Sequence, residues 1–380
     1  MRKSILGLIF CISASTGNLA LSKDEKPRVE ADGTIHVEAF ELPESAYLSD
    51  ETRAELKRAR EYDFEKEEPE VAAEFKACGS FDDTDVADMH ALRKCQAGAY
   101  YKTAGYKHLR ARYDVTVTSQ TIGGVYAEVF TPADSLAQKN KNRVLINVHG
   151  GSYRDGSRTI SQIESIPIAA VGKIKVVSID YRMAPEHRFP AASEDVAAVY
   201  RELLKDYKPE NIGIYGCSAG AFLVAHSMAW FLNEDLPLPG AAGMFCAGAL
   251  TALDNDNFKL RYADGFNIGG TIVGIRQQFE SRKPPFSYFD GVNVDTPLAA
   301  PGGYDEVMKE FPPSLLISGT RDFDLSEVIH THRQLVRLGV EADLHIWEGM
   351  EHGFFGNPDL PESREAYDVI VKFFDGQLGR

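Results

Sequence analysis

The feature that most constrains the fold is a short apolar run that leads through a glycine-flanked serine directly into helical sequence. Residues 212–220 are Ile-Gly-Ile-Tyr-Gly-Cys-Ser-Ala-Gly, and residues 221–231 have helix-forming composition. In a Gly-x-Ser-x-Gly turn the serine takes strained backbone angles between a strand and a helix, so its close neighbours must lack side chains. Such a turn lifts the Ser218 hydroxyl above a sheet and aims a helix N-terminus at the same point. The pattern therefore predicts a nucleophilic serine.

Strand-like runs alternate with helical stripes after residue 110. The apolar runs are 143–148, 175–179, 212–215, 244–249, 314–318 and 342–347. Two alternating runs, 113–117 and 126–130, flank Gly123-Gly124, which is typical of a hairpin. Continuously apolar strands suit a sheet that is covered on both faces. We therefore expect an α/β fold with a mostly parallel central sheet flanked by helices.

A second glycine-rich segment, residues 147–153, follows a predicted strand with the sequence Asn-Val-His-Gly-Gly-Ser-Tyr. Acyl transfer creates an oxyanion, which preorganised backbone N–H groups stabilise, and glycines let the backbone approach closely enough to donate. We expect the donors to be amides of this loop and of the serine turn, namely Gly150, Gly151 or Ser152, with Ala219. His149 is expected to hold the loop and not to act as the base.

A serine hydroxyl becomes a good nucleophile only when a base takes its proton, and an imidazole base needs a carboxylate to orient it. On a sheet entered by such a turn, the chain order is serine, acid, histidine. His352 lies in Gly-Met-Glu-His-Gly after the predicted strand 342–347, and Asp322 follows the strand 314–318. We assign Ser218, Asp322 and His352 as a catalytic triad, with Asp324 as the alternative acid.

The N-terminal part has a different character. Arg2 and Lys3 precede an apolar run over residues 5–12 and small residues over 13–20, which predicts a signal peptide over residues 1–20 and a secreted or periplasmic protein. Residues 21–110 form an acidic N-terminal cap or extension, with helices expected over 53–64 and 84–104. From Asp24 to Asp88 the chain carries 21 acidic and 8 basic residues.

Four cysteines remain when the signal peptide is removed. Cys78 and Cys95 are the natural disulfide pair in an oxidising compartment, and their loop would stabilise the fold by about 3 kcal/mol. Cys217 and Cys246 lie in apolar contexts and are expected to be buried free thiols. No Cys/His cluster has zinc spacing, so no structural metal is predicted.

Composition restricts the partners. The net charge is −15 and the sequence pI is about 5.2, whereas a phosphate-binding protein needs a basic face, so no nucleic acid is expected. No run beyond the signal peptide is long and apolar enough for an integral membrane span. We expect a small-molecule ester as the partner, and a homodimer is left open.

Aromatic residues gather where the walls of a substrate pocket are expected. Residues 251–297, rich in Gly, Asn, Asp and aromatics, interrupt the alternating pattern and are interpreted as a cap insertion within a catalytic domain over 111–380. The predicted apolar pocket comprises Tyr153, Phe286, Tyr288, Phe289 and Phe354. For Phe354 and its neighbour Phe355, a place in the core is an equal alternative.

These motifs together resemble the hormone-sensitive-lipase-like branch of the α/β-hydrolases. The resemblance rests on His149-Gly150-Gly151, on Gly-x-Ser-Ala-Gly over 216–220, and on Tyr-Arg-Met-Ala-Pro-Glu-His-Arg-Phe-Pro-Ala-Ala over 181–192. It covers residue 115 to the C-terminus and implies carboxylic-ester hydrolysis without a cofactor, with a helical cap over the pocket. Ser152 stands where many members have a third glycine, and Cys217 where aspartate is frequent.

Three functions are weighed on this basis. The first is a carboxylesterase that works through an acyl-enzyme. The second is a lactonase, or a deacetylase of a sugar or natural product, that uses the same triad. The third is a non-catalytic binding protein on a hydrolase scaffold; such proteins usually lose a triad residue, whereas all three positions are filled here.

Overall fold

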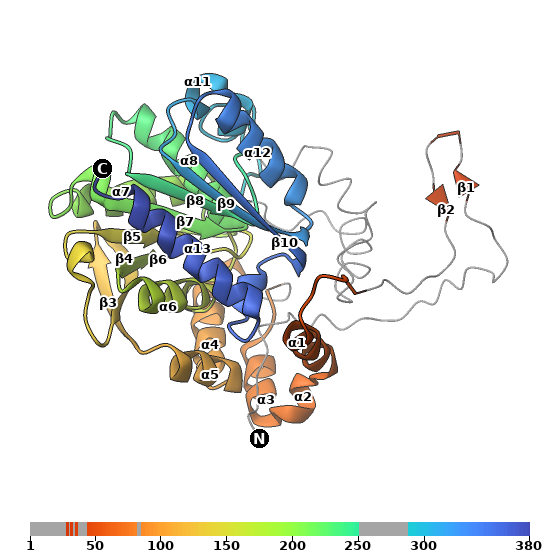
Figure 1. Ribbon diagram of the computed structural model, residues 1–380. Helices are drawn as coiled ribbons and strands as arrows, with labels where there is room; N and C mark the ends of the chain where they lie inside the picture. Colours follow the sequence, from red (N-terminus) through yellow and green to blue (C-terminus); the bar gives the residue numbers. More distant parts are fainter. Residues whose placement is uncertain (1–27, 30, 33–34, 37–43, 82–84, 251–287) are drawn as a thin grey trace.

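The computed structural model describes residues 28–29, 31–32, 35–36, 44–81, 85–250 and 288–380. The predicted signal peptide, most of the predicted insertion and Phe286 lie outside these residues. The described chain forms one eight-stranded sheet in the order β10-β9-β8-β7-β5-β6-β4-β3 (Figure 1). Its strands are β3 (Val115–Ile122), β4 (Val125–Pro132), β5 (Val144–Asn147), β6 (Lys175–Ile179), β7 (Ile212–Cys217), β8 (Ala241–Phe245), β9 (Ser314–Arg321) and β10 (Ala342–Glu351). A separate two-stranded ladder pairs β1 (Arg28–Val29) with β2 (Ile35–His36).

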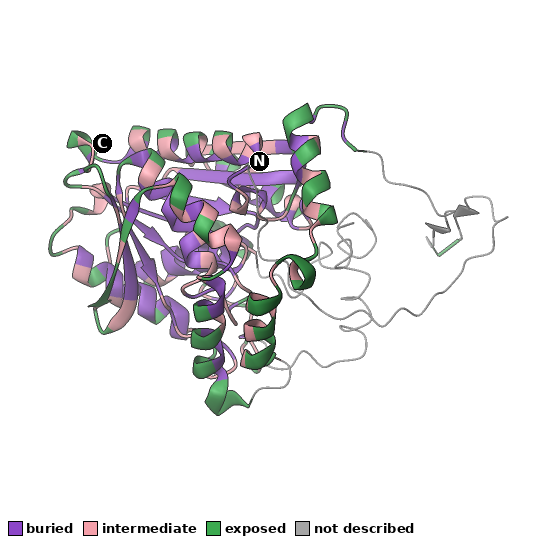
Figure 2. Cartoon of the chain, turned by 90° about the horizontal axis from the view of Figure 1, so that it is seen from below, coloured by how far each residue is buried: buried purple, intermediate pink, exposed green. Residues whose placement is uncertain are grey.

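Helices cover both faces of the sheet, which confirms the predicted α/β architecture. The helices that follow β5 are α6 (Ile160–Gly172), α7 (Ala191–Leu203), α8 (Ala219–Asn233), α11 (Asp305–Met308), α12 (Leu325–Arg337) and α13 (Pro361–Gln377). Short 3-10 turns span Val86–Asp88, Gln138–Asn140, Pro209–Asn211, Pro301–Gly303 and Phe354–Gly356. Figure 2 shows that the central strands of the sheet are buried, while the helices expose their outer sides.

Side-chain alternation along the strands explains why there are two apolar layers. In β5, Val144 and Ile146 join the cluster that packs under α7, α8 and α12, whereas Leu145 joins the cluster under α6 and α13. Because successive strand residues face opposite sides, a strand buried on both faces must be apolar throughout. This explains why the continuous apolar runs in the sequence predict the strands well.

Two elements that the sequence predicts, the hairpin at Gly123-Gly124 and the strand over 244–249, can be compared with the observed backbone angles. The hairpin is confirmed, since Ile122 pairs with Val125 across Gly123 and Gly124, whose φ angles are 58° and 85°. The strand predicted over 244–249 is wrong in its bounds, because β8 ends at Phe245. Cys246 takes a φ of 60°, which turns the chain out of the strand although the following residues are apolar.

The described residues of the acidic N-terminal region form five α-helices, and this region docks on the rest of the chain. They are α1 (Asp50–Glu61), α2 (Phe64–Glu67), α3 (Pro69–Cys78), α4 (Met89–Tyr100) and α5 (Ala104–Arg112). The helix expected over 53–64 corresponds to α1. The single helix expected over 84–104 is wrong in its bounds, because α4 ends at Tyr100 and a second helix, α5, begins at Ala104. A disulfide between Cys78 and Cys95, with Cα atoms 5.6 Å apart, joins α3 to α4.

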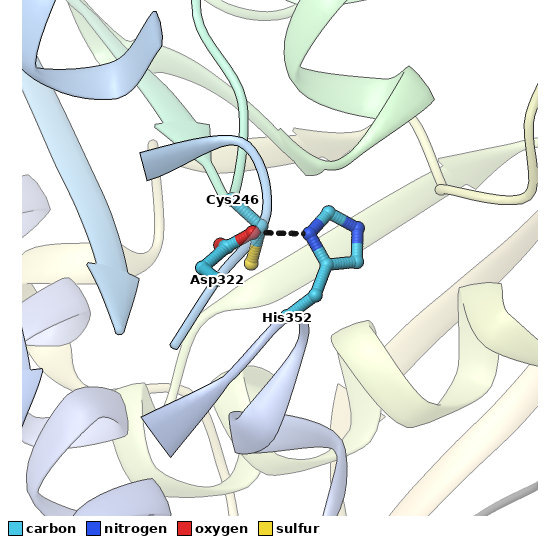
Figure 3. A group of neighbouring side chains, drawn as sticks. All are labelled: Cys246, Asp322 and His352. Carbon is cyan, nitrogen blue, oxygen red and sulfur yellow. Dashed lines mark hydrogen bonds and ion pairs between the residues drawn. The ribbon is translucent and has the colours of Figure 1, made fainter. Parts of the chain in front are cut away.

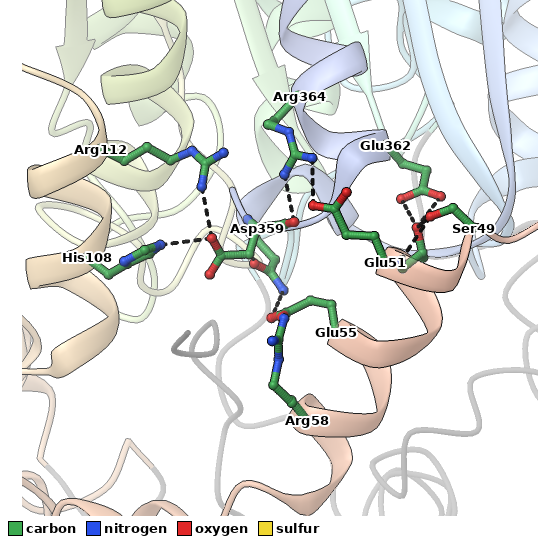
Figure 4. Close-up of polar contacts among 11 residues, drawn as sticks. Ser49, Glu51, Glu55, Arg58, His108, Arg112, Asp359, Glu362 and Arg364 are labelled. Atoms are coloured by element: carbon green, nitrogen blue, oxygen red, sulfur yellow. Dashed lines mark hydrogen bonds and ion pairs between the residues drawn. The ribbon is translucent and has the colours of Figure 1, made fainter. Parts of the chain in front are cut away.

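Polar contacts fix α1 and α5 to the C-terminal part of the chain (Figure 4). The buried Thr52 hydroxyl donates to Glu362 at 2.7 Å, and Arg364 pairs with Glu51 at 2.9 Å. Asp359 accepts from Arg112 of α5 at 3.0 Å. Part of the acidic excess of the N-terminal region is thus used in docking.

Among the described residues, no helix combines the length and the apolar composition that crossing a bilayer requires.

Candidate active site

Ser218 lies in the sharp turn between β7 and α8, with φ 58° and ψ −125°. The flanking glycines are required by a close backbone approach. A Cβ at Gly216 would lie 2.1 Å from the Val148 carbonyl oxygen, and one at Gly220 would lie 2.0 Å from the same atom. The segment after β5 therefore passes directly against the serine turn, which places the two glycine-rich motifs in contact.

The loop after β5 lies beside Ser218 and is held in an unusual conformation. Gly151, Ser152 and Tyr153 have φ angles of 110°, 55° and 57°. A Cβ at Gly150 would lie 2.8 Å from the Cys217 carbonyl oxygen and 3.5 Å from the Ser218 Cβ. Backbone groups of this loop can approach the serine so closely because Gly150 has no side chain.

Glu164 of α6 ties this loop to the serine turn, and the sequence reasoning missed it. Its carboxylate accepts from the Gly150 N–H at 3.0 Å and from Asn147 Nδ2 at 2.8 Å, and it interacts with the Cys217 backbone. Burial raises the pKa of Glu164 to about 7, although these donors and nearby His352 oppose the rise. The Gly150 N–H is therefore already engaged. The signal that could have found Glu164 is a lone acidic residue in a mostly apolar helix.

Asp322 and His352 form a hydrogen-bonded pair at the ends of β9 and β10 (Figure 3). The His352 Nδ1–H donates to Asp322 Oδ1 at 2.7 Å, and the Asp322 side chain is fully buried. Ser318 donates to Asp322 Oδ2 at 2.8 Å, and the Asp324 N–H donates to Oδ1 at 3.0 Å. Of the two predicted acids, Asp322 contacts the imidazole, while the backbone of Asp324 positions Asp322.

The loop that carries His352 is fixed against β9. A Cβ at Gly319 would lie 2.0 Å from the Met350 carbonyl oxygen, so the two segments can meet only because this residue is glycine. The Gly349 N–H donates to Thr320 Oγ1 at 2.8 Å. The imidazole stacks on the Phe323 ring, with centroids 4.1 Å apart. These contacts hold the ring in one orientation.

Cys246, at the end of β8, connects the serine turn to the Asp–His pair. Its thiol interacts with that of Cys217, the residue before Ser218. The Cys246 Sγ, a carboxylate oxygen of Asp322 and a ring nitrogen of His352 all lie within 4.8 Å of one another. Both thiols are buried, as the sequence predicts. Since β8 lies between β7 and β9, the serine, acid and histidine occupy one edge of the sheet.

His149 is buried and neutral. Burial lowers the pKa of His149 to about 4, its Nδ1–H donates to the Gly150 carbonyl oxygen at 2.7 Å, and its ring stacks on Tyr181. The Tyr181 hydroxyl donates to the His149 carbonyl oxygen at 2.7 Å. These contacts fit a residue that holds the loop and does not accept protons.

Arg93 of α4 ties the N-terminal region to this same part of the molecule, and nothing in the sequence pattern indicated it. Its guanidinium donates to the carbonyl oxygens of Arg154 and Ala184, both at 2.7 Å, and pairs with Glu186 at 2.6 Å. Arg154 directly follows the glycine-rich loop. The N-terminal helices therefore brace that loop.

The predicted pocket residues divide into two groups. Tyr153 stacks on Tyr288 with centroids 4.5 Å apart and meets Phe289 edge-on at 5.7 Å, so these three form one aromatic cluster beside the loop. Phe354 lies instead in the core, where it packs against Trp347 and Phe355. This place corresponds to the core alternative for Phe354, and Tyr153 and Tyr288 are buried to a similar degree.

Comparison with known proteins gives a consistent picture. A family model described as the alpha/beta hydrolase fold matches residues 145–356. An acetyl-hydrolase from Streptomyces hygroscopicus is 28% identical over 261 residues, which cover 68% of this chain and 82% of that protein. Two solved structures are similar. The esterase E25 has a TM-score of 0.71 at 26% identity over 91% of this chain and 99% of that chain. An esterase from the bacterial hormone-sensitive lipase family has a TM-score of 0.61 at 26% identity over 82% and 99%.

Proposed function

The chain belongs to the α/β-hydrolase fold family as a hormone-sensitive-lipase-like carboxylic ester hydrolase, and from this premise we propose that it works through a Ser218–His352–Asp322 triad and an acyl-enzyme. The observation that carries the proposal is the 2.7 Å contact between His352 and Asp322, on the same sheet edge as the strained Ser218 turn. An imidazole oriented in this way by a buried carboxylate can act as a general base through its other nitrogen.

The proposed reaction has two halves. Ser218 attacks the ester carbonyl while His352 Nε2 accepts its proton, and His352 then protonates the departing alcohol. Water repeats the sequence on the acyl-enzyme. Because the Gly150 N–H is engaged by Glu164, we assign the oxyanion to the amides of Gly151, Ser152 and Ala219. Each such donor is worth roughly 3 kcal/mol in the transition state.

The aromatic cluster of Tyr153, Tyr288 and Phe289 supports an apolar wall for the acyl or aryl group of the ester. We expect a series of 4-nitrophenyl esters of increasing acyl length to show a clear optimum. Phe289→Ala is expected to shift that optimum and to lower kcat/KM for the preferred ester about tenfold, since burying an aromatic ring is worth 1–3 kcal/mol. Equal rates at every acyl length, together with unchanged kinetics in Phe289→Ala, would count against this wall.

A deacetylase is the second function that an observation favours. The acetyl-hydrolase relative aligns over 82% of its own length, and the same triad would remove an acetyl group from a sugar or natural product. The ester series separates the two functions: an optimum at acetyl favours the deacetylase, and an optimum at longer chains favours the broader carboxylesterase.

We also propose that the protein is exported, with residues 1–20 removed. The Cys78–Cys95 pair supports export, because structural disulfides persist in oxidising compartments. Mass spectrometry of protein recovered outside the cytoplasm is expected to find an N-terminus between residues 16 and 21. A full-length chain that is found only in the cytoplasm would contradict export.

A further inference from the structure

Cys246 is a buried thiol that the proposed hydrolysis does not use, yet it lies against the Asp322–His352 pair. Its Sγ, an Asp322 oxygen and a His352 ring nitrogen all lie within 4.8 Å of one another. Figure 3 shows the sulfur beside the carboxylate that faces the imidazole. The three side chains come from the ends of adjacent strands β8, β9 and β10.

The backbone of Cys246 creates this placement. Consecutive residues of a strand face opposite sides of the sheet, but Cys246 and Phe245 belong to the same apolar cluster. The left-handed φ of 60° at Cys246 accounts for this, because it ends the regular strand and turns the side chain toward Cys217 and the Asp–His pair. A non-glycine residue in this conformation is strained and is typical of functional sites.

A thiolate sulfur, an imidazole nitrogen and a carboxylate oxygen are all ligands that Zn²⁺ accepts in tetrahedral sites. Bond lengths of about 2.0–2.3 Å place such ligands roughly 3–4 Å apart, so the group needs to contract only modestly. We propose that Cys246, Asp322 and His352 form an inhibitory site for a thiophilic divalent cation such as Zn²⁺. The fourth position is left for water.

The inhibition follows from where the imidazole carries its proton. Without metal, His352 Nδ1 holds the proton that it donates to Asp322, and Nε2 keeps its lone pair. A cation bound at Nδ1 uses the lone pair of Nδ1 itself, so in a neutral ring the proton that Nδ1 carried must move to Nε2. Nε2 then has no lone pair to accept the Ser218 proton. The effect on activity rests on the proposed triad, whereas metal binding itself does not.

Binding also releases one proton, because the Cys246 thiol becomes a metal-bound thiolate without any change of oxidation state. The groups around this thiol are Cys217 of β7, Glu164 of α6, Asp322 and His352.

The test combines inhibition with direct binding on the whole mature protein. Zn²⁺ is expected to abolish ester hydrolysis reversibly, with recovery on adding EDTA. In Cys246→Ser and Cys246→Ala, each measured against its own uninhibited rate, the half-inhibiting concentration is expected to rise at least tenfold. His90→Ala, which removes an exposed histidine of α4, is the matched control and is expected to keep the sensitivity of the natural protein.

Cd²⁺ provides the readout that does not depend on activity. One equivalent is expected to give the ultraviolet charge-transfer absorbance of a cadmium thiolate in the natural protein and in Ser218→Ala. The same absorbance is expected to be missing from both Cys246 variants, whose folding is checked by thermal unfolding. Unchanged Zn²⁺ inhibition in folded Cys246 variants, or no thiolate absorbance in the natural protein, overturns the proposal. Cd²⁺ binding at Cys246 in a protein whose activity survives Ser218→Ala would instead keep the metal site and refute the triad.

Discussion

Replacing Ser218 by alanine is expected to lower kcat for ester hydrolysis on the order of a millionfold. The activity that remains is what the protein supplies without its triad. The change removes the only atom that can form the acyl-enzyme in the proposed mechanism. The φ of 58° at this position is strained for serine and alanine alike, so the turn between β7 and α8 is expected to survive. Steady-state kinetics on a 4-nitrophenyl ester, with circular dichroism of both proteins, measures the loss.

A fluorophosphonate provides the companion measurement, because it labels an activated serine covalently. We expect one label per natural chain, located by peptide mapping on Ser218, and none in Ser218→Ala. A natural protein that hydrolyses the ester but carries its label on another serine would show that the nucleophile lies elsewhere. A folded protein that takes no label and cleaves no ester would favour the binding-protein alternative.

The sequence predicted the parts of the fold that depend on local pattern. Strands buried on both faces appear as continuous apolar runs, and the Gly123-Gly124 turn marks the hairpin whatever surrounds it. The end of β8 could not be predicted, because residues 246–249 are as apolar as the strand itself and only the backbone angle at Cys246 ends it. Apolar composition likewise cannot tell a pocket wall from a core, which is why the sequence leaves both places open for Phe354.

The residues of the candidate site that lie in short sequence motifs could be predicted. The residues that hold the glycine-rich loop from other parts of the chain could not. Ser218, His352 and the glycine-rich loop stand at recognisable turns after strands. Glu164 has its loop partner 14 residues away in the sequence, and Arg93 of the N-terminal region has its partners 61 to 93 residues away. No periodicity records such contacts, because they depend on how the helices dock on the loop.

Asp322→Asn is expected to lower kcat/KM about ten-thousandfold. The amide removes the buried negative charge that stabilises the imidazolium of His352 in the transition state. Its NH₂ group can also donate to His352 Nδ1, which forces the ring proton onto Nε2, the nitrogen that must accept from Ser218. Because Asn has the same shape as Asp, the hydrogen bond from Ser318 at 2.8 Å can be retained, and the fold should tolerate the change.

Asp324→Asn is the matched control, since both residues are buried at the same loop and receive the same change. The contribution of Asp324 to the pair is its backbone N–H, 3.0 Å from Asp322 Oδ1, and the substitution leaves that group in place. We therefore expect Asp324→Asn to lose less than tenfold in kcat/KM. If instead Asp324→Asn loses the larger factor while Asp322→Asn remains active, the acid has been assigned to the wrong carboxylate. Equal small losses in both would mean that His352 needs no carboxylate partner, which the buried 2.7 Å contact argues against.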